Sequence, residues 1–422
     1  MDRKHFSDNS PGGIVQATNA AGQKDWAFVP RKMPPAWDFD PGLWLLVTEA
    51  RDALGTLNGI GRTLPNPQLL LRPLQQREAL ASSSIEGTYV TPEQLVMYEL
   101  DPKDPKSGDE QAADWREVFN YTKALRHGCA LLQTLPLCNR LICEMHRILM
   151  EGSRGRSKSP GQFRNCQVQI GSAGRFLPPP AAEVVPLMND LEQYMNTDTN
   201  EYDPLVRCFL VHYQFEAIHP FRDGNGRVGR ALLALMIYSY FGHAMPWLYL
   251  SAFFEQYRDE YVSNLFKVST DGDWSRWVEF CLRATIAQAE DSIIRCDRFK
   301  ILREEFHQRI KSPSPRSHSI IEGLFSQPAV TVKTVQEEFK IAYNTARRDL
   351  ERLAAVGILK ETQESHVLVF YSQEIMKIAF EDHEQSESNR NEKESDQPAD
   401  ATPPSSSEPQ QPSSQSQSVS LP

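Results

Sequence analysis

The stretch His219-Pro-Phe-Arg-Asp-Gly-Asn-Gly-Arg-Val-Gly-Arg230 gathers an imidazole, a carboxylate, a glycine-rich turn and guanidinium groups into one short segment. Before it, apolar residues recur at helical spacing from Leu205 to Ile218, and Pro220 forbids the continuation of that helix. We therefore expect His219 at a helix end. The apolar run that follows predicts a second helix starting near Asn225.

The start of the second helix has the features of a phosphate site. Gly224, Asn225 and Gly226 form its first turn, where backbone amides have no partner within the helix and the helix dipole is positive. Arg227 and Arg230 are three residues apart, so both guanidinium groups can point the same way and hold the outer phosphates of a nucleotide.

Two neighbouring side chains add chemistry to this site. Asp223 is a hard oxygen ligand through which Mg²⁺ can bridge phosphates. His219, with an ordinary pKa of about 6.5, can take a proton from an attacking hydroxyl at neutral pH. We interpret the whole stretch as a phosphate-handling active site.

Three other interpretations of the stretch are available. A lone histidine at a helix end is more often structural, but His219 does not stand alone. His212, Glu216 and His219 have a spacing that zinc ligands can adopt, although Pro220 and the lack of a further ligand weigh against it, and His212 is more simply a core residue. A P-loop is excluded because its lysine and following Ser or Thr are missing.

The stretch resembles the Fic motif, His-x-Phe-x-Asp/Glu-Gly-Asn-Gly-Arg-x-x-Arg. All eight fixed positions are present, as His219, Phe221, Asp223, Gly224, Asn225, Gly226, Arg227 and Arg230. The resemblance implies transfer of AMP from ATP to a protein hydroxyl within an α-helical domain.

Carried over by position, the resemblance gives each residue a role. His219 would be the general base and Asp223 the Mg²⁺ ligand. The anion hole would be Gly224, Asn225 and Gly226, while Arg227 and Arg230 would hold the β- and γ-phosphates. Phe221 would anchor the loop in the core.

A second motif lies upstream, in Ala81-Ser-Ser-Ser-Ile-Glu-Gly-Thr88. Gly87 marks a helix end, with Glu86 in the last turn, where a carboxylate opposes the helix dipole and an arginine is the obvious partner. The segment resembles the inhibitory motif of Fic proteins, with Ser82, Glu86 and Gly87 at its fixed positions, and the upstream Asn66-Pro67 also looks like that family's N-terminal domain.

The resemblance implies that the protein is autoinhibited. If Glu86 pairs with Arg230, ATP can bind but not in the reactive pose, and a misplacement of about 1 Å can lower a rate on the order of a hundredfold. The alternative is that Glu86 is a solvated surface acid. In some relatives this glutamate also positions a water for removal of AMP, and we hold the same double role here as a hypothesis.

Residues 162–180 interrupt the helical pattern. Val168 and Ile170 alternate with polar residues before Gly171 and the turn at Ala173-Gly174, which predicts a β-hairpin. It resembles the Fic flap, whose edge strand pairs with a target peptide. An ordinary surface hairpin is the alternative.

The C-terminal part predicts a winged helix. Helices are expected at Ser317 to Phe325, Val332 to Phe339 and Asn344 to Val356, followed by an alternating strand at Val367 to Tyr371. The third helix would present Arg347, Arg348 and Arg352 to a DNA major groove. A docking or dimerising module is the alternative, which Asp349, Glu351 and the acidic chain favour.

Composition excludes several classes of protein. The net charge of −10 and pI of about 5.6 argue against a general nucleic-acid coat. Seven cysteines without a C-x-x-C pair fit a reducing compartment. No apolar run approaches a membrane span and the N-terminus lacks a signal core, so we expect a cytoplasmic protein without a membrane partner.

The expected fold is mainly α: a Fic helical bundle with a β-hairpin flap, then a small winged-helix domain and a disordered tail. The expected divisions are a flexible N-terminus (1–25), a helical N-terminal domain with the inhibitory helix (26–111), the Fic catalytic core (112–303), the winged helix (304–375) and the tail (384–422).

The expected function is that of an autoinhibited protein adenylyltransferase with ATP as substrate and Mg²⁺ as cofactor. Its target would be a Ser, Thr or Tyr hydroxyl of another protein or of itself, and a homodimer is a family-based expectation. The alternative is a DNA-binding or docking regulator, acting through residues 317–371, whose Fic site responds to nucleotide.

Overall fold

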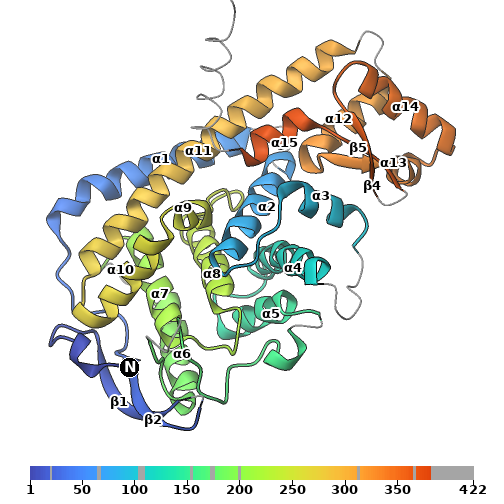
Figure 1. Cartoon of the computed structure of the whole chain (residues 1–422). Coiled ribbons are helices and arrows are strands. Elements are labelled where there is room, and N and C mark those ends of the chain that lie inside the picture. Colours follow the sequence, from blue (N-terminus) through green and yellow to red (C-terminus); the bar gives the residue numbers. More distant parts are fainter. Residues whose placement is uncertain are drawn as a thin grey trace, which may run out of the picture. The chain divides into compact units, whose positions relative to one another are not determined.

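The computed structural model describes residues 1–19, 21–63, 68–102, 110–152, 155–171, 176–197, 201–310, 314–364 and 367–381. Most of these residues are helical, which confirms the mainly α fold (Figure 1). The α-helices in these ranges are α1 (Trp44–Thr63), α2 (Gln68–Ile85), α3 (Pro92–Leu100), α4 (Glu110–Leu131), α5 (Asn139–Leu149), α6 (Ala181–Asn196), α7 (Pro204–Ile218), α8 (Asn225–Tyr240), α9 (Ser251–Gln256), α10 (Arg258–Asp271), α11 (Trp274–Arg309), α12 (Pro315–Ser326), α13 (Val332–Phe339), α14 (Tyr343–Ala355) and α15 (Gln373–Phe380). Short 3-10 helices lie at Arg3–His5, Pro41–Leu43 and Arg156–Lys158.

Helix α7 is the centre of the core. Every residue from Leu205 to Ile218 is buried except Glu216. A helix that is apolar on all sides must be covered on all sides, and α7 packs against α6, α8, α10 and α11. The loop after α7 therefore starts from a rigid support.

Helix α2 connects two parts of the fold. It packs against α4, α8 and α9, and also against α12 and α15 of the C-terminal region. Its end is marked by Gly87, which has φ +90°, the left-handed conformation that glycine adopts freely. The helix itself ends at Ile85, so Glu86 follows the last turn instead of lying in it as the sequence suggested.

The N-terminus differs from the expected flexible segment at 1–25. Strand β1 (Gly12–Thr18) pairs antiparallel with β2 (Lys24–Pro30), so the region from Trp26 also begins as a strand and not as a helix. Phe28 has no exposed surface, and a Cβ on Gly12 would lie 2.3 Å from its ring. Ser10 Oγ donates to the carbonyl of Ser269 at 2.7 Å. Burial of Phe28 and contacts to α10 order this polar segment.

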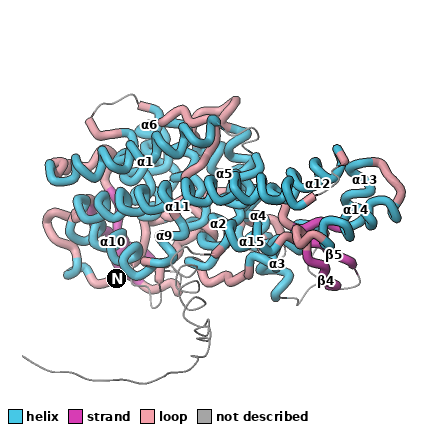
Figure 2. Tube along the Cα trace, turned by 90° about the horizontal axis from the view of Figure 1, so that it is seen from above, coloured by secondary structure: helices cyan, strands magenta, loops and turns pink. Residues whose placement is uncertain are grey.

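The winged helix is confirmed. Helices α12, α13 and α14 lie where they were expected, and β4 (Lys360–Glu364) pairs antiparallel with β5 (Val367–Tyr371). A short strand β3 (Ala329–Thr331) completes a sheet of order β3-β5-β4, and α15 follows it. Helices α13 and α14 and strands β4 and β5 lie together at one end of the fold, whereas α15 packs against α11 (Figure 2). Neither β3 nor α15 was predicted, and the tail at 384–422 lies outside the described residues.

The flap is described only in part. Ile170 and Phe176 form one antiparallel bridge, with hydrogen bonds of 2.9 and 3.3 Å in the two directions. No longer strand is assigned in the described parts of 162–180. The turn expected at Ala173-Gly174 lies outside the described residues, as does Asn66-Pro67.

Two expectations drawn from composition can be compared with the structure. All seven cysteines are free thiols. In the described ranges, no helix has the length and apolar character needed to cross a membrane.

Candidate active site

The loop from His219 to Gly224 lies between two buried helices, as the sequence predicts. His219 caps the C-terminal end of α7 with φ +52°, and Gly224 caps the start of α8 with φ +76°. The Asn225 side chain closes the loop: its Oδ1 accepts from the Phe221 amide at 2.7 Å and its Nδ2 donates to the Phe221 carbonyl at 2.9 Å. The loop is thus held in one conformation before any ligand binds.

A ring stack between Phe221 and His146 of α5 supports the loop. Phe221 has no exposed surface and stacks on the ring of His146 at a centroid distance of 3.8 Å. His146 Nδ1 accepts from the Gly161 amide at 2.9 Å, so its Nε2 carries the proton and donates to the Asp223 carbonyl at 3.1 Å. Burial lowers the pKa of His146 to about 4, which keeps this tautomer neutral.

His219 is a neutral base at physiological pH. Burial, with the positive charge of Arg164, lowers the pKa of His219 to about 4. Its buried Nδ1 has no well-aligned hydrogen-bond partner among the described residues. The nearby backbone carbonyl of Glu216 acts to raise the pKa of His219, but burial outweighs this effect. Arg164 Nε donates to the His219 carbonyl at 2.8 Å and fixes the residue in place.

The first turn of α8 presents unpaired backbone donors. Within the described residues the amides of Asn225, Gly226 and Arg227 make no hydrogen bond. The Glu86 carboxylate lies directly against this turn, since a Cβ on Gly226 would be 2.1 Å from Glu86 Oε1. Glu86 thus places a negative charge beside the helix end at which an anion would bind.

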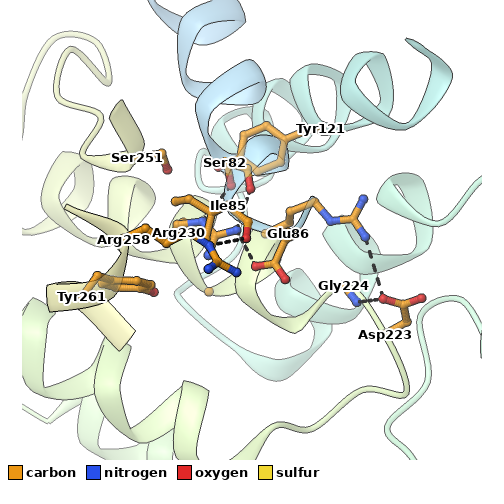
Figure 3. Close-up of polar contacts among 12 residues, drawn as sticks. Ser82, Ile85, Glu86, Tyr121, Asp223, Gly224, Arg230, Ser251, Arg258 and Tyr261 are labelled. Atoms are coloured by element: carbon orange, nitrogen blue, oxygen red, sulfur yellow. Dashed lines mark hydrogen bonds and ion pairs between the residues drawn. The ribbon is translucent and has the colours of Figure 1, made fainter. Parts of the chain in front are cut away.

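Arg230 is held by the segment that ends α2 (Figure 3). Its Nη2 donates to Glu86 Oε1 at 2.8 Å and to the Ser82 carbonyl at 2.8 Å, and its Nε donates to Ser82 Oγ at 2.8 Å. The Arg230 side chain is 2% exposed and that of Glu86 38%. The pair that the sequence suggested is therefore present.

The pKa values of the pair agree with a charged contact. Burial alone raises the pKa of Glu86, but the charge and hydrogen bond of Arg230 outweigh it, so this pKa lies below its ordinary value. Burial acts to lower the pKa of Arg230, but the charge of Glu86 outweighs it, so the pKa of Arg230 lies above its ordinary value. Both groups remain ionised at neutral pH.

Arg227 has a carboxylate partner that the sequence did not suggest. Its Nη1 contacts Glu117 Oε1 on α4, and its Nη2 lies 3.8 Å from Asp223 Oδ1. The Arg227 side chain is only 5% exposed, so a counter-charge stabilises it. Both arginines of the motif are thus paired with carboxylates from other elements.

Asp223 has the properties of a Mg²⁺ ligand. Its side chain is 46% exposed, and its Oδ1 accepts from the Gly224 amide at 2.7 Å. Lys158 lies 3.9 Å from its Oδ2. In the described ranges no group of three metal-ligating side chains exists, and His212 uses its nitrogens for the Gly229 carbonyl and the Tyr261 hydroxyl, so it is a core residue and the zinc alternative is wrong. One carboxylate with substrate phosphates and water suits Mg²⁺.

Glu117, Asp223 and Arg227 line a pocket of about 100 Å³, and a second, larger cavity has a volume of about 290 Å³. His219, Gly226, Arg230 and Glu86 line one side of it. The remaining wall is largely aromatic and aliphatic, and it includes Ile85, Ile170, Phe176, Tyr213, Tyr261, Val262, Leu265 and Phe266. A flat apolar ring fits the aromatic and aliphatic wall, and an anion fits the side that contains Arg230.

Comparison with known proteins agrees with this geometry. The Fic/DOC family N-terminal pattern matches residues 44–130 and the Fic/DOC family pattern matches residues 136–237, which contain the loop. The chain thus contains a Fic/DOC family N-terminal region and a Fic/DOC family domain. A DeoR-like helix-turn-helix domain matches residues 316–363.

Two curated relatives of the Fic domain show what this chain resembles. The protein adenylyltransferase Fic of Drosophila grimshawi is 28% identical over 243 residues, which cover 56% of this chain and 46% of the relative. The same protein of Drosophila mojavensis is 28% identical over 243 residues, covering 56% and 44%. The chain thus spans about half the length of these relatives.

A solved structure supports the fold. A Fic family protein from Desulfovibrio desulfuricans G20 matches with a TM-score of 0.51 and 21% identity, covering 81% of this chain and 98% of that one. The similarity extends beyond the Fic core, which fits the continuous packing of α2, α11 and α12.

Several residues of the Fic site had no signal in the sequence. Glu117 and His146 stand on α4 and α5 outside any motif. Arg164 lies within the expected flap at 162–180, but nothing in the sequence indicated its hydrogen bonds to the carbonyls of Ile218 and His219. A buried polar residue within an apolar helix pattern is the one hint available, and His146 in α5 is such a residue.

Glu216 is the remaining unassigned acid of the Fic site. Burial raises the pKa of Glu216 to about 8, opposed by the charge of Arg230 and reinforced by that of Glu86. Its Oε1 is buried without a hydrogen-bond partner among the described residues, and it lies where a Cβ on Gly229 would clash, at 2.2 Å. At neutral pH this carboxyl is mostly protonated.

Proposed function

We propose that this Fic protein is a protein adenylyltransferase that moves AMP from ATP to a Ser, Thr or Tyr hydroxyl of a target protein or of itself. One observation carries the proposal: a neutral imidazole, unpaired helix amides and a buried guanidinium all face a single cavity of about 290 Å³. The names of the curated relatives support the same chemistry.

The arrangement supports an in-line transfer. The phosphates bind the amides of Gly226 and Arg227 and the guanidinium groups of Arg227 and Arg230. Asp223 would hold Mg²⁺, which would supply positive charge to the phosphates. The target hydroxyl oxygen forms a bond to the α-phosphorus, the bond from that phosphorus to the oxygen of the β-phosphate breaks, and pyrophosphate leaves. His219 takes the hydroxyl proton.

In the proposed resting state Glu86 blocks this reaction. Its carboxylate occupies the space over Gly226 and the Nη2 of Arg230, so a γ-phosphate meets both a filled position and a negative charge. ATP then binds in a shifted pose, in which the α-phosphorus is not aligned with the hydroxyl. Displacement of Glu86 releases Arg230 and the helix end together.

The identity of the transferred group is tested with ATP labelled separately on the α- and γ-phosphates. Adenylyl transfer leaves the α-label on protein and releases the γ-label as pyrophosphate, whereas phosphoryl transfer gives the reverse. Labelled UTP and CDP-choline test the related transfers. A chase with Mg²⁺ and no ATP then measures removal of AMP, which we propose as a second role for Glu86; label that stays on wild-type protein argues against this role.

DNA binding by the winged helix is a second candidate function. Helix α14 exposes Tyr343, Asn344, Arg347, Arg348 and Arg352 on its surface. Arg347 pairs with Glu351 at 2.8 Å and Arg352 lies 3.9 Å from Asp349, whereas Arg348 makes no ion pair in the described part of the chain. The match to a DeoR-like helix-turn-helix domain supports insertion of this helix into a major groove.

We expect the Arg347→Ala/Arg348→Ala double variant to lose DNA affinity if this candidate is correct. Each phosphate contact that is removed should lower the slope of log affinity against log salt concentration by about one in magnitude. Fluorescence anisotropy of labelled duplex DNA at several salt concentrations measures both effects. Arg283→Ala, on α11, is the control for a general loss of charge. Wild-type protein that binds no duplex would favour a protein-docking role instead.

The pH profile of activity should have no acid limb near 6.5. We expect kcat/KM of the Glu86→Gly variant to stay level down to pH 5.5, because the pKa of His219 is about 4 and removal of the Glu86 charge lowers it further. An alkaline limb is expected at or below pH 8, since loss of Glu86 lowers the pKa of Glu216 from about 8 and its ionised form repels phosphate.

The Glu216→Gln exchange tests the second half of this profile. The amide keeps the shape of Glu216 but cannot ionise, so the alkaline limb should vanish in a Glu86→Gly/Glu216→Gln variant. Initial rates with α-labelled ATP from pH 5 to 9.5 measure the profile. An acid limb centred near 6.5 would contradict the assignment of a neutral His219 with a lowered pKa.

A further inference from the structure

Helix α2 carries a buried acid that the proposed reaction does not use. Glu78 is 2% exposed and lies one turn before Ser82 and two turns before Glu86. Residues at i, i+4 and i+8 lie on nearly the same helix face. Glu78 and Ser82 are therefore buried on the same face of α2, and the partly exposed Glu86 follows the end of this helix.

The Glu78 carboxylate is bound by three donors from two other helices. Its Oε1 accepts from the Tyr121 hydroxyl on α4 at 2.7 Å and from Ser251 Oγ at 2.5 Å, and its Oε2 accepts from the Ser251 amide at 3.0 Å. Ser251 is the first residue of α9, so two of the three donors come from one residue of this helix. Figure 3 shows Tyr121 and Ser251 on opposite sides of the α2 segment that holds Arg230.

This burial has an energetic consequence. Burial raises the pKa of Glu78, while the hydrogen bonds from Ser251 and Tyr121 and the charge of Arg230 act in the opposite direction. A buried carboxyl is tolerated only when its oxygens are satisfied, and a lost partner leaves a group that is expensive to bury. A displacement of α2 that breaks the hydrogen bonds of Glu78 is therefore energetically unfavourable.

A second contact holds the other end of this segment. Arg258, the first residue of α10, donates from Nε to the Ile85 carbonyl at 3.0 Å, one residue before Glu86. Helices α9 and α10 thus bind α2 both at Glu78 and at Ile85. Tyr261, one turn after Arg258, lines the cavity beside Arg230.

We propose that Glu78 is the positioning residue of the inhibitory segment: its contacts with Tyr121 and Ser251 hold α2 where Glu86 reaches Arg230. This inference rests on the proposed inhibition of the Fic site by Glu86. The bonds to Glu78 exist only while α2 is seated on α4 and α9, and are replaced by water when α2 moves out. Each bond lost by mutation thus shifts the balance toward the released, active state.

The test uses Tyr121→Phe in the full chain, once with Glu86 present and once in a Glu86→Gly background. Loss of one bond to a buried carboxyl should raise self-labelling by α-labelled ATP by a factor of roughly 5 to 30 when Glu86 is present. In the Glu86→Gly background the same exchange should change the rate by less than about twofold, because no inhibitory contact is left to weaken.

Tyr202→Phe is the matched control. The Tyr202 hydroxyl is also bound within the fold, donating to the carbonyls of Pro35 and Trp37, but Tyr202 does not touch α2. It should lower the melting temperature without raising self-labelling. Glu78→Gln should keep inhibition largely intact, since its amide oxygen can still accept from the Ser251 amide and both hydroxyls can rotate to accept from its nitrogen.

The outcomes separate this inference from the proposed function. If Glu86→Gly itself fails to raise labelling, the proposed inhibition is wrong. If Glu86→Gly activates but Tyr121→Phe changes the rate equally in both backgrounds, or not at all, the role of Glu78 is overturned and the network is only structural. If Tyr202→Phe raises self-labelling as much as Tyr121→Phe does, the role of Glu78 is overturned as well.

Discussion

Replacement of Glu86 by glycine should raise self-labelling by α-labelled ATP on the order of a hundredfold, the typical effect of restoring about 1 Å of alignment at a reacting centre. The exchange removes the carboxylate that lies against Gly226 and pairs with Arg230 at 2.8 Å. Arg230 and the amides of α8 then become available to the outer phosphates. Initial rates of label incorporation at saturating ATP and Mg²⁺ measure the effect.

A matched control is Glu93→Gly, which removes an exposed acid from the first turn of α3. It should leave the labelling rate unchanged. Because Glu86 interferes with alignment more than with binding, the gain should appear in kcat and not mainly in KM. An unchanged rate for Glu86→Gly would mean that the Glu86–Arg230 pair is structural and that the site is not autoinhibited through it.

Replacement of His219 by alanine in the Glu86→Gly background should lower labelling by a factor of about 10² to 10⁴, the usual contribution of a positioned general base. The structure gives the reason for a large loss. The imidazole is neutral, it lines the same cavity as Arg230, and in the described residues no second histidine lines that cavity.

The loss should not come from a failure to bind ATP. His219→Ala leaves the amides of α8 and both motif arginines in place, so binding of a non-hydrolysable ATP analogue should change little by calorimetry. His127→Ala, on α4 and away from the cavity, is the control for a general effect of histidine removal. Label that persists in His219→Ala would show that another group takes the proton.

The local features of the site could be predicted from the sequence. Pro220 ends α7 and Gly224 starts α8 for reasons that lie within a few residues, so the loop between them could be placed from its own sequence. The position of Glu86 near a helix C-terminus suggested an arginine partner, and the resemblance to the Fic inhibitory motif named Arg230 as that partner. The winged helix followed from its periodic pattern in the same way.

The N-terminal hairpin shows where such reasoning fails. The segment 12–18 is short and has few large apolar side chains, so its sequence pattern resembles that of a mobile segment. What orders them is Phe28 in the core and the bond from Ser10 to the carbonyl of Ser269, a residue 259 positions away. No local signal carries a contact of that sequence separation.

The sequence by itself determined the chemistry of the loop, because helix ends, glycine turns and charge spacing act over a few residues, and a motif resemblance pointed to Glu86 as the acid that faces it. The tertiary structure alone decided the rest. It placed Glu117 on Arg227, His146 under Phe221, and Tyr121 with Ser251 on Glu78. Each of these contacts requires a buried polar group to find its partner on a distant element, and that choice is made by how whole helices pack and not by the residues beside it.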